Sequence, residues 1–249
     1  MTAGWLRPVV EALDATGTPC PVFFRNDDAG WDMPQLDALL DVFDRHGTPI
    51  DLAVIPTEVT PQLARELGSR AAGSPVRLHQ HGYAHTNHEP TGRKCEFGPD
   101  RSRADQQLDI GRGRERLIEA FGPHLDPVFT PPWNRCTDDT ADALLANGIE
   151  VLSRDHTADR LDRHGLAEVP VTVDWFGRRK GVRWTRDELA GHLAGGIGSG
   201  PALGVMLHHA LCDRSERRAI AELLDALHAH PAVRPTTILE LAAVAPRAG

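Results

Sequence analysis

The sequence predicts a single α/β domain in which parallel strands alternate with helices, as in a parallel sheet or a barrel. Two observations support this fold class. Short apolar runs alternate with amphipathic stretches along the chain, and such alternation implies right-handed βαβ units. No linker-like change in composition, internal repeat or low-complexity tract interrupts residues 1–249, so we expect one domain. With 249 residues, of which 41% are hydrophobic, the chain can bury a large core.

The expected elements follow from the local hydrophobic patterns, taken in chain order. Pro21–Asp27 is an apolar run typical of a buried strand, and Met33–His46 carries apolar side chains at helical spacing. Asp51–Ile55 is a second strand, and Thr60–Arg70 is a helix that begins with an N-cap Thr followed by Pro. The later strands are expected at Val76–His81, Asp126–Thr130, Glu150–Ser153, Glu168–Trp175 and Ala202–His209. The later helices are expected to end near Phe121, to pass through Ala141–Ala146, and to cover Thr185–Leu193 and Ser215–His230, while Gly82–Asp100 forms a polar loop.

The charge and the termini restrict the partners and the compartment. The formal net charge is −8, whereas binders of nucleic acid or anionic membranes need a basic face. No stretch is long and apolar enough to span a membrane, and Glu11 and Asp14 interrupt the only candidate core of a secretory signal. We therefore expect a cytoplasmic protein with no nucleic-acid partner and no membrane span, and the oligomeric state stays open. A basic cluster at Arg178–Arg183 is interpreted as a solvated loop, with contact to an anionic substrate left open.

Polar side chains that could take part in catalysis or metal binding gather at the ends of four of the expected strands. The segments are Asn26–Gly30, His79–His88, Thr130–Asn134 and Leu207–His209. In parallel α/β folds the carboxyl ends of the strands face one side, and active sites form there. The four segments together therefore predict one site.

The second of these segments contains four of the 13 histidines within ten residues. His81 and His85 are four residues apart, a spacing that brings two imidazoles together on one helical turn, as in helical zinc pairs. Gly82 lets the backbone turn sharply out of the strand. His79 shares the strand face of His81 and could contact it without binding the metal itself. For His79 and His88, a purely structural role in the core or a solvated position stays open.

A metal site also needs an oxygen ligand, and Asp27 and Asp28 end the first strand. Two adjacent carboxylates point in different directions, so one can bind a metal while the other acts as a base. Two histidines and one carboxylate leave open positions for water and substrate, as a catalytic site requires. In isolation, the two carboxylates could instead form a turn or a helix cap ahead of Gly30.

These motifs resemble those of the polysaccharide deacetylases of the NodB-homology group, carbohydrate esterase family four. The family's TFDD-like, H[ST]xxH, RxPP[YW]-like, DW and LxH motifs correspond here to NDDAG, HGYAH, TPPWN, VDW and LHH, in the same order. The matches extend from Asn26 to His209, which is most of the chain. The resemblance implies a NodB-like fold, a distorted (β/α)-barrel with seven strands.

The resemblance also implies a role for each matched residue. Asp28, His81 and His85 match the residues that hold a divalent metal, most simply Zn²⁺. Such a metal lowers the pKa of water towards about 7. Asp27 matches the catalytic base, which would take the proton of the attacking water.

The remaining roles concern the leaving group and the oxyanion. His208 matches the catalytic acid, and Asp174 matches the carboxylate that orients it. His209 follows directly, and strand alternation lets only one of the two histidines point into the barrel, so His209 stays an alternative acid. The backbone N–H of Trp133 matches the donor that completes the oxyanion hole.

Two positions depart from the family pattern. Gly82 replaces the Ser or Thr that follows the first metal histidine, and Thr130 stands where the family has an Arg that orients the base. Loss of that Arg removes a cation that would keep Asp27 ionised. Arg25 or Arg135 could take its place.

The predicted activity is that of a metal-dependent amide hydrolase that removes an acetyl group from an N-acetylated carbohydrate or glycoconjugate, small or oligomeric. Two alternatives remain: an amidohydrolase acting on a non-carbohydrate amide, and a catalytically inactive relic that binds metal or sugar. The triplet His79–His81 resembles the HxH motif of cyclic amidohydrolases, but there it lies on the first barrel strand and here on the third. Iron oxygenases with two histidines and one carboxylate generally use antiparallel sandwiches, which the strand–helix alternation disfavours.

Overall fold

The computed structural model describes residues 3–161 and 163–244, and these residues form two compact units that alternate along the chain. The first unit contains residues 3–27, 32–50 and 171–237, and the second contains residues 28–31, 51–161, 163–170 and 238–244. The rest of the predicted domain, residues 1–2, 162 and 245–249, lies outside the described residues. In the described part, no helix has the length and apolar character needed to cross a bilayer.

The first unit is built on parallel strands. These are β1 (Cys20–Ala29), β7 (Val173–Asp174), β10 (Leu203–His208) and β11 (Val233–Pro235). β1 pairs with both β10 and β11, and β10 pairs in turn with β7. The apolar run at 22–24 is fully buried in β1, as its composition predicts. The register places Asp27 beside His208, at the carboxyl ends of β1 and β10.

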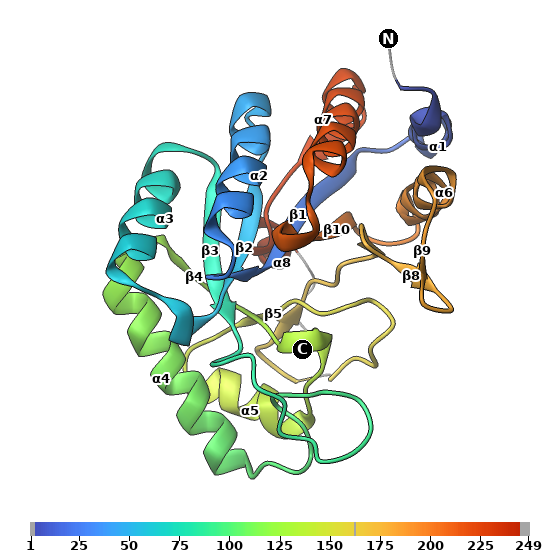
Figure 1. The fold of residues 1–249 in the computed structure, drawn as a ribbon. Coiled ribbons are helices and arrows are strands. Elements are labelled where there is room, and N and C mark those ends of the chain that lie inside the picture. Colours follow the sequence, from blue (N-terminus) through green and yellow to red (C-terminus); the bar gives the residue numbers. More distant parts are fainter. Residues whose placement is uncertain (1–2, 162, 245–249) are drawn as a thin grey trace. The chain divides into compact units, whose positions relative to one another are not determined.

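Helices flank these strands. They are η1 (Gly4–Leu6), α1 (Arg7–Thr16), α2 (Met33–His46), α6 (Arg186–Gly196), η5 (His209–Leu211) and α7 (Arg214–Ala229), and a separate antiparallel hairpin joins β8 (Arg178–Arg179) to β9 (Val182–Arg183). α2 has the predicted bounds, buries its apolar stripe and lies beside α7 (Figure 1). α1 was not predicted, since only Val9 and Leu13 mark its buried face.

The second unit contains the other parallel strands, in the spatial order β6–β5–β4–β3–β2. Their bounds are β2 (Ile50–Val54), β3 (Val76–His81), β4 (Leu125–Thr130), β5 (Val151–Leu152) and β6 (Ala167–Glu168). The helices are η2 (Pro56–Glu58), α3 (Pro61–Gly73), α4 (Arg103–Phe121), η3 (Gly122–His124), η4 (Pro132–Asn134), α5 (Asp138–Ala146) and α8 (Ile238–Val244). α4 packs against α5 (Figure 1). In the core of the same unit, Phe97 meets Phe129 edge to face with the ring centroids 5.4 Å apart, a favourable arrangement for two aromatic rings.

A buried carboxylate connects the first of these strands to the last helix. The backbone N–H of Ile238, the first residue of α8, donates to the carboxylate of Asp51 in β2 at 3.1 Å. Burial raises the pKa of Asp51 to about 8, against the opposing effect of this hydrogen bond. The next strand pair carries an ion pair in which Arg77 Nε donates to Asp126 Oδ2 at 2.9 Å.

The parallel α/β class is confirmed, and two details differ from the sequence-based expectation. The main path of the sheet has eight strands, three from the first unit and five from the second, where seven were expected, and β11 pairs beside β1. The stretch Glu168–Trp175 is not one strand. Glu168 belongs to β6 and Val173–Asp174 forms β7, in different units, and Pro170 between them has no N–H to donate to a strand ladder.

Candidate active site

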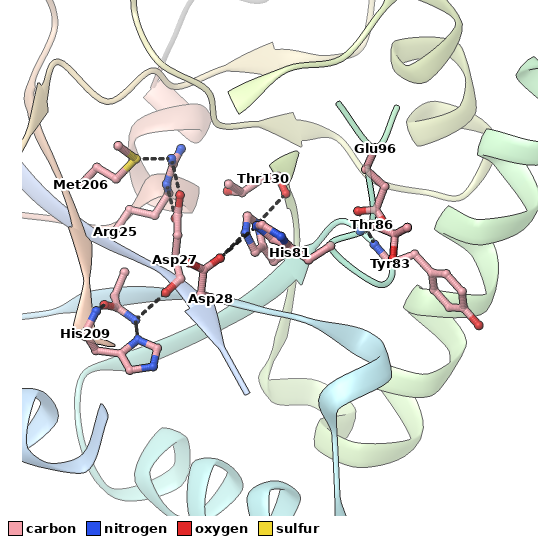
Figure 2. Close-up of polar contacts among 12 residues, drawn as sticks. Arg25, Asp27, Asp28, His81, Tyr83, Thr86, Glu96, Thr130, Met206 and His209 are labelled. Carbon is pink, nitrogen blue, oxygen red and sulfur yellow. Dashed lines mark hydrogen bonds and ion pairs between the residues drawn. The ribbon is translucent and has the colours of Figure 1, made fainter. Parts of the chain in front are cut away.

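Three predicted metal ligands of the second unit lie together. The ligand atoms of Asp28, His81 and His85 are all within 4.8 Å of one another. Asp28 Oδ1 lies 3.1 Å from His81 Nε2, the contact drawn in Figure 2, and 3.2 Å from His85 Nε2. Two imidazole nitrogens and one carboxylate oxygen suit Zn²⁺ and other divalent transition metals, and they leave coordination positions open. The donor set therefore fits a catalytic metal.

The carbonyl of Thr130 at the end of β4 orients the first histidine ligand. His81 Nδ1 lies 2.9 Å from this oxygen, so Nδ1 carries the proton and the lone pair of Nε2 faces Asp28. The Gly82 N–H donates to the same oxygen at 3.1 Å. The Thr130 hydroxyl lies 2.8 Å from Nε2 of the buried His79. Thr130 thus contacts two histidines of β3 at once.

The local structure of the histidine pair differs from the expected helical turn. His81 is the last residue of β3, and His85 lies in the following loop with a φ of 54°. The two rings still meet, with centroids 5.2 Å apart, because the chain turns back at positive φ values rather than winding into a helix. His88 lies further along the same loop, where its side chain is exposed and its N–H donates to the Cys95 carbonyl at 3.0 Å.

Backbone strain is concentrated at this centre. Asp28, His85, Trp133 and Asn134 have φ values of 66°, 54°, 56° and 58°, in the left-handed region. Only two other non-glycine residues in the described part share this region. Such conformations cost free energy and are typical of functional positions, where the surroundings hold them.

Two indole rings enclose His85. The Trp133 ring centroid lies 4.5 Å from that of His85, and the Trp31 centroid lies 4.9 Å away, both edge to face. Trp31 keeps 38% of its surface exposed. Within residues 3–161 and 163–244, the backbone N–H of Trp133 donates to no other group, which leaves it available to an oxyanion.

The predicted base belongs to the first unit and has a buried cationic partner. Arg25 Nε donates to Asp27 Oδ1 at 2.8 Å, and a terminal nitrogen donates to Oδ2 at 2.9 Å, as Figure 2 shows. The two residues are two apart on β1, so their side chains share a face. Of the two substitutes proposed for the missing Arg, Arg25 binds Asp27, whereas Arg135 donates to the Lys94 carbonyl at 2.7 Å.

The two candidate acids have different surroundings. His209 is fully buried, its N–H donates to Asn26 Oδ1 at 2.9 Å, and its Nδ1 lies 3.0 Å from Asn26 Nδ2. His208 is partly exposed at the end of β10. A proton donor must reach its substrate, so the geometry favours His208. Asp174 lies at the end of β7, where its Oδ1 accepts the Phe176 N–H at 2.9 Å.

A scan against protein-family models found no match, and neither did a search of curated proteins. Solved structures are similar. A candidate polysaccharide deacetylase from Mycobacterium smegmatis has a TM-score of 0.68 at 20% identity, covering 94% of this chain and 95% of its own. A family 4 acetyl xylan esterase from Clostridium thermocellum, in complex with a cobalt ion, has a TM-score of 0.60 at 15% identity and 89% coverage of both chains. The fold is that of the polysaccharide deacetylases.

The distorted (β/α)-barrel expected from the motifs is therefore confirmed. The same deacetylase fold occurs in a CE4 family pseudoenzyme from Bacillus anthracis, which has a TM-score of 0.60 at 14% identity and is covered to 66%, against 91% of this chain. Activity thus depends on the residues of the site rather than on the deacetylase fold.

Glu96, which no motif singles out, explains one departure from the deacetylase motifs. Its buried carboxylate accepts the N–H group of Tyr83 at 3.2 Å (Figure 2) and that of Ala84 at 2.7 Å, in the loop between the two candidate metal-binding histidines. A Cβ on Gly82 would lie 2.1 Å from Glu96 Oε2 and 2.6 Å from the Pro132 ring. The deacetylase Ser or Thr therefore has no room here. The only sequence signal was an acidic residue between Cys95 and Phe97 in a polar loop.

Proposed function

We propose that the protein is a metal-dependent amide hydrolase that removes the acetyl group of an N-acetylated carbohydrate. The observation that carries this proposal is the Asp28–His81–His85 cluster in a chain with the polysaccharide deacetylase fold. A divalent cation, most simply Zn²⁺, would be held by these three side chains. When bound, it would supply an acidic water and polarise the acetyl carbonyl.

The chain's own residues would handle the protons and the developing charge. The Asp27 carboxylate would accept a proton from the attacking water, and the two hydrogen bonds from Arg25 would fix its orientation. The Trp133 N–H would donate a hydrogen bond to the oxyanion. His208 would protonate the leaving nitrogen, and the products would be acetate and a free amino sugar.

Loss of both imidazole ligands should abolish metal binding. We expect wild-type protein to contain close to one equivalent of metal and the His81→Ala, His85→Ala double variant to contain almost none, measured by elemental analysis. His124→Ala with His164→Ala is the matched control, because neither side chain belongs to the cluster. Full metal occupancy in the ligand variant would refute the site.

Removal of either proton-transfer group should stop turnover and leave the metal in place. We expect Asp27→Asn and His208→Ala each to lower kcat by about 10²-fold or more, measured as acetate release from N-acetylated sugars. Asp27→Asn also leaves the buried Arg25 without its carboxylate partner, which could destabilise the fold. His208 is partly exposed, so His208→Ala tests the loss of chemistry without that cost.

An inactive relic is the second candidate, because a pseudoenzyme shares the fold. Metal-loaded wild-type protein that releases no acetate from N-acetylated or O-acetylated sugars, or from simple acetamides, would establish it. Turnover of acetamides alone would indicate the non-carbohydrate amidohydrolase.

A further inference from the structure

Three cations lie together in the second unit, on the loop after His88 and on the turn after Trp133. We call Arg93, Lys94 and Arg135 the cationic cluster. Arg135 is partly buried and donates to the Lys94 carbonyl at 2.7 Å, which joins the two segments. Burial and, next, the charge of Arg93 lower the pKa of Arg135, so the like charges are close enough to disfavour one another.

Among the residues that the structure describes, no carboxylate forms an ion pair with the cationic cluster. The nearby carboxylates accept backbone N–H groups instead: Glu96 accepts those of Tyr83 and Ala84, and Glu89 accepts that of Asp100 at 3.4 Å. In the basic hairpin β8–β9, Arg183 pairs with Glu216 at 3.1 Å.

The cationic cluster is linked to the metal centre through one ring. The Lys94 Nζ lies over the Trp133 indole, 5.9 Å from its centroid, and the same indole packs against His85. A group held by the cluster would therefore lie one indole away from a metal ligand.

We propose that the cationic cluster is a subsite for an anionic group on the substrate, a phosphate or a carboxylate attached to the N-acetylated sugar. Guanidinium groups bind such anions through paired hydrogen bonds, and the Lys ammonium adds a point charge. The inference rests on the proposed function and specifies its substrate class.

Binding measured without turnover tests this subsite. The probes are N-acetylglucosamine, its 6-phosphate, and N-acetylmuramic acid as the carboxylate arm, titrated by calorimetry into metal-loaded and chelator-treated protein. We expect one or both anionic sugars to bind at least about 10-fold more tightly than the neutral sugar, with a preference that weakens as salt rises. The Arg93→Gln, Lys94→Met double variant should lose the preference. Arg135 is left unchanged because it supports the turn.

Lys180→Met is the matched control, since Lys180 is the only other lysine and lies in the β8–β9 hairpin. It should keep the full preference. Equal binding of neutral and anionic sugars, or a preference that survives in the double variant, would overturn the subsite. Acetate release from the neutral sugar without any anion preference would leave the hydrolase standing and remove only this inference. Preferential binding of an anionic sugar without acetate release would support the subsite and contradict the proposed hydrolase activity.

Discussion

Single residues at the candidate metal centre are held in conformations that their types disfavour. Asp28, His85 and Trp133 all have positive φ, which costs of order 1 kcal/mol or more for each non-glycine residue. Neighbouring groups support the candidate site: the Thr130 carbonyl fixes His81, two indoles enclose His85, and the Glu96 carboxylate binds the loop between the two histidines. The geometry of the candidate ligands is therefore supported by residues outside the Asp28–His81–His85 cluster.

The Glu96→Gln substitution should loosen this loop. A carboxamide offers one acceptor oxygen, so its NH₂ group would face the N–H of Tyr83 or Ala84, donor against donor. We expect metal affinity to fall about 10-fold, and the Ala84 amide to exchange faster with solvent in metal-free protein. Glu89→Gln, on the same loop, is the control and should change neither quantity. Wild-type affinity and exchange in Glu96→Gln would show that the carboxylate does not position the loop.

At the scale of elements, the end of β3 leads directly into the loop that carries the candidate ligand His85. The apolar alternation of Val76–His81 sets the strand, and its bounds match the prediction. The loop after His81 has no periodic pattern. The chain turns at Gly82, with φ of 55°, a conformation that glycine adopts without steric cost. Glu96 and Pro132 occupy the space where a side chain would lie.

Gly82→Ala separates steric exclusion from backbone strain when it is compared with Gly92→Ala. Both glycines have positive φ, but a Cβ on Gly92 would meet nothing within 4 Å. We expect Gly92→Ala to lower the free energy of unfolding by about 1 kcal/mol, and Gly82→Ala to lower it by at least twice that and to weaken metal binding. Urea unfolding and metal titration measure both effects. Equal costs for the two variants would mean that Glu96 and Pro132 yield without penalty.

At the scale of the whole molecule, a buried acid makes folding stability depend on pH. The pKa of Asp51 is raised by burial from 3.8 to about 8, so the folded state keeps a proton that the unfolded state loses. Its contribution to the free energy of unfolding therefore falls as pH rises from about 4 to about 8. Below pH 4 both states are protonated, and the penalty is absent.

Asp51→Asn should remove this dependence, because the amide oxygen can still accept the Ile238 N–H and carries no charge. We expect the variant to match wild type near pH 4 and to be more stable by a few kcal/mol at pH 8, measured by urea unfolding across the range. The exposed Asp100→Asn is the control and should follow the wild-type curve. A variant curve parallel to wild type would show that Asp51 is not the buried acid responsible.

The sequence by itself determined the α/β alternation, the bounds of α2 and β3, and the set of three metal-ligand candidates, because each is encoded in a local spacing or in a motif of fixed order. Only the tertiary structure decided the rest. It split Glu168–Trp175 between two units, chose Arg25 as the partner of Asp27, buried His209 against Asn26, and brought Glu96 to the loop of His85. These outcomes depend on contacts between residues that are distant along the chain or on the face that a side chain presents. Local sequence patterns encode neither these long-range contacts nor the face on which a side chain lies.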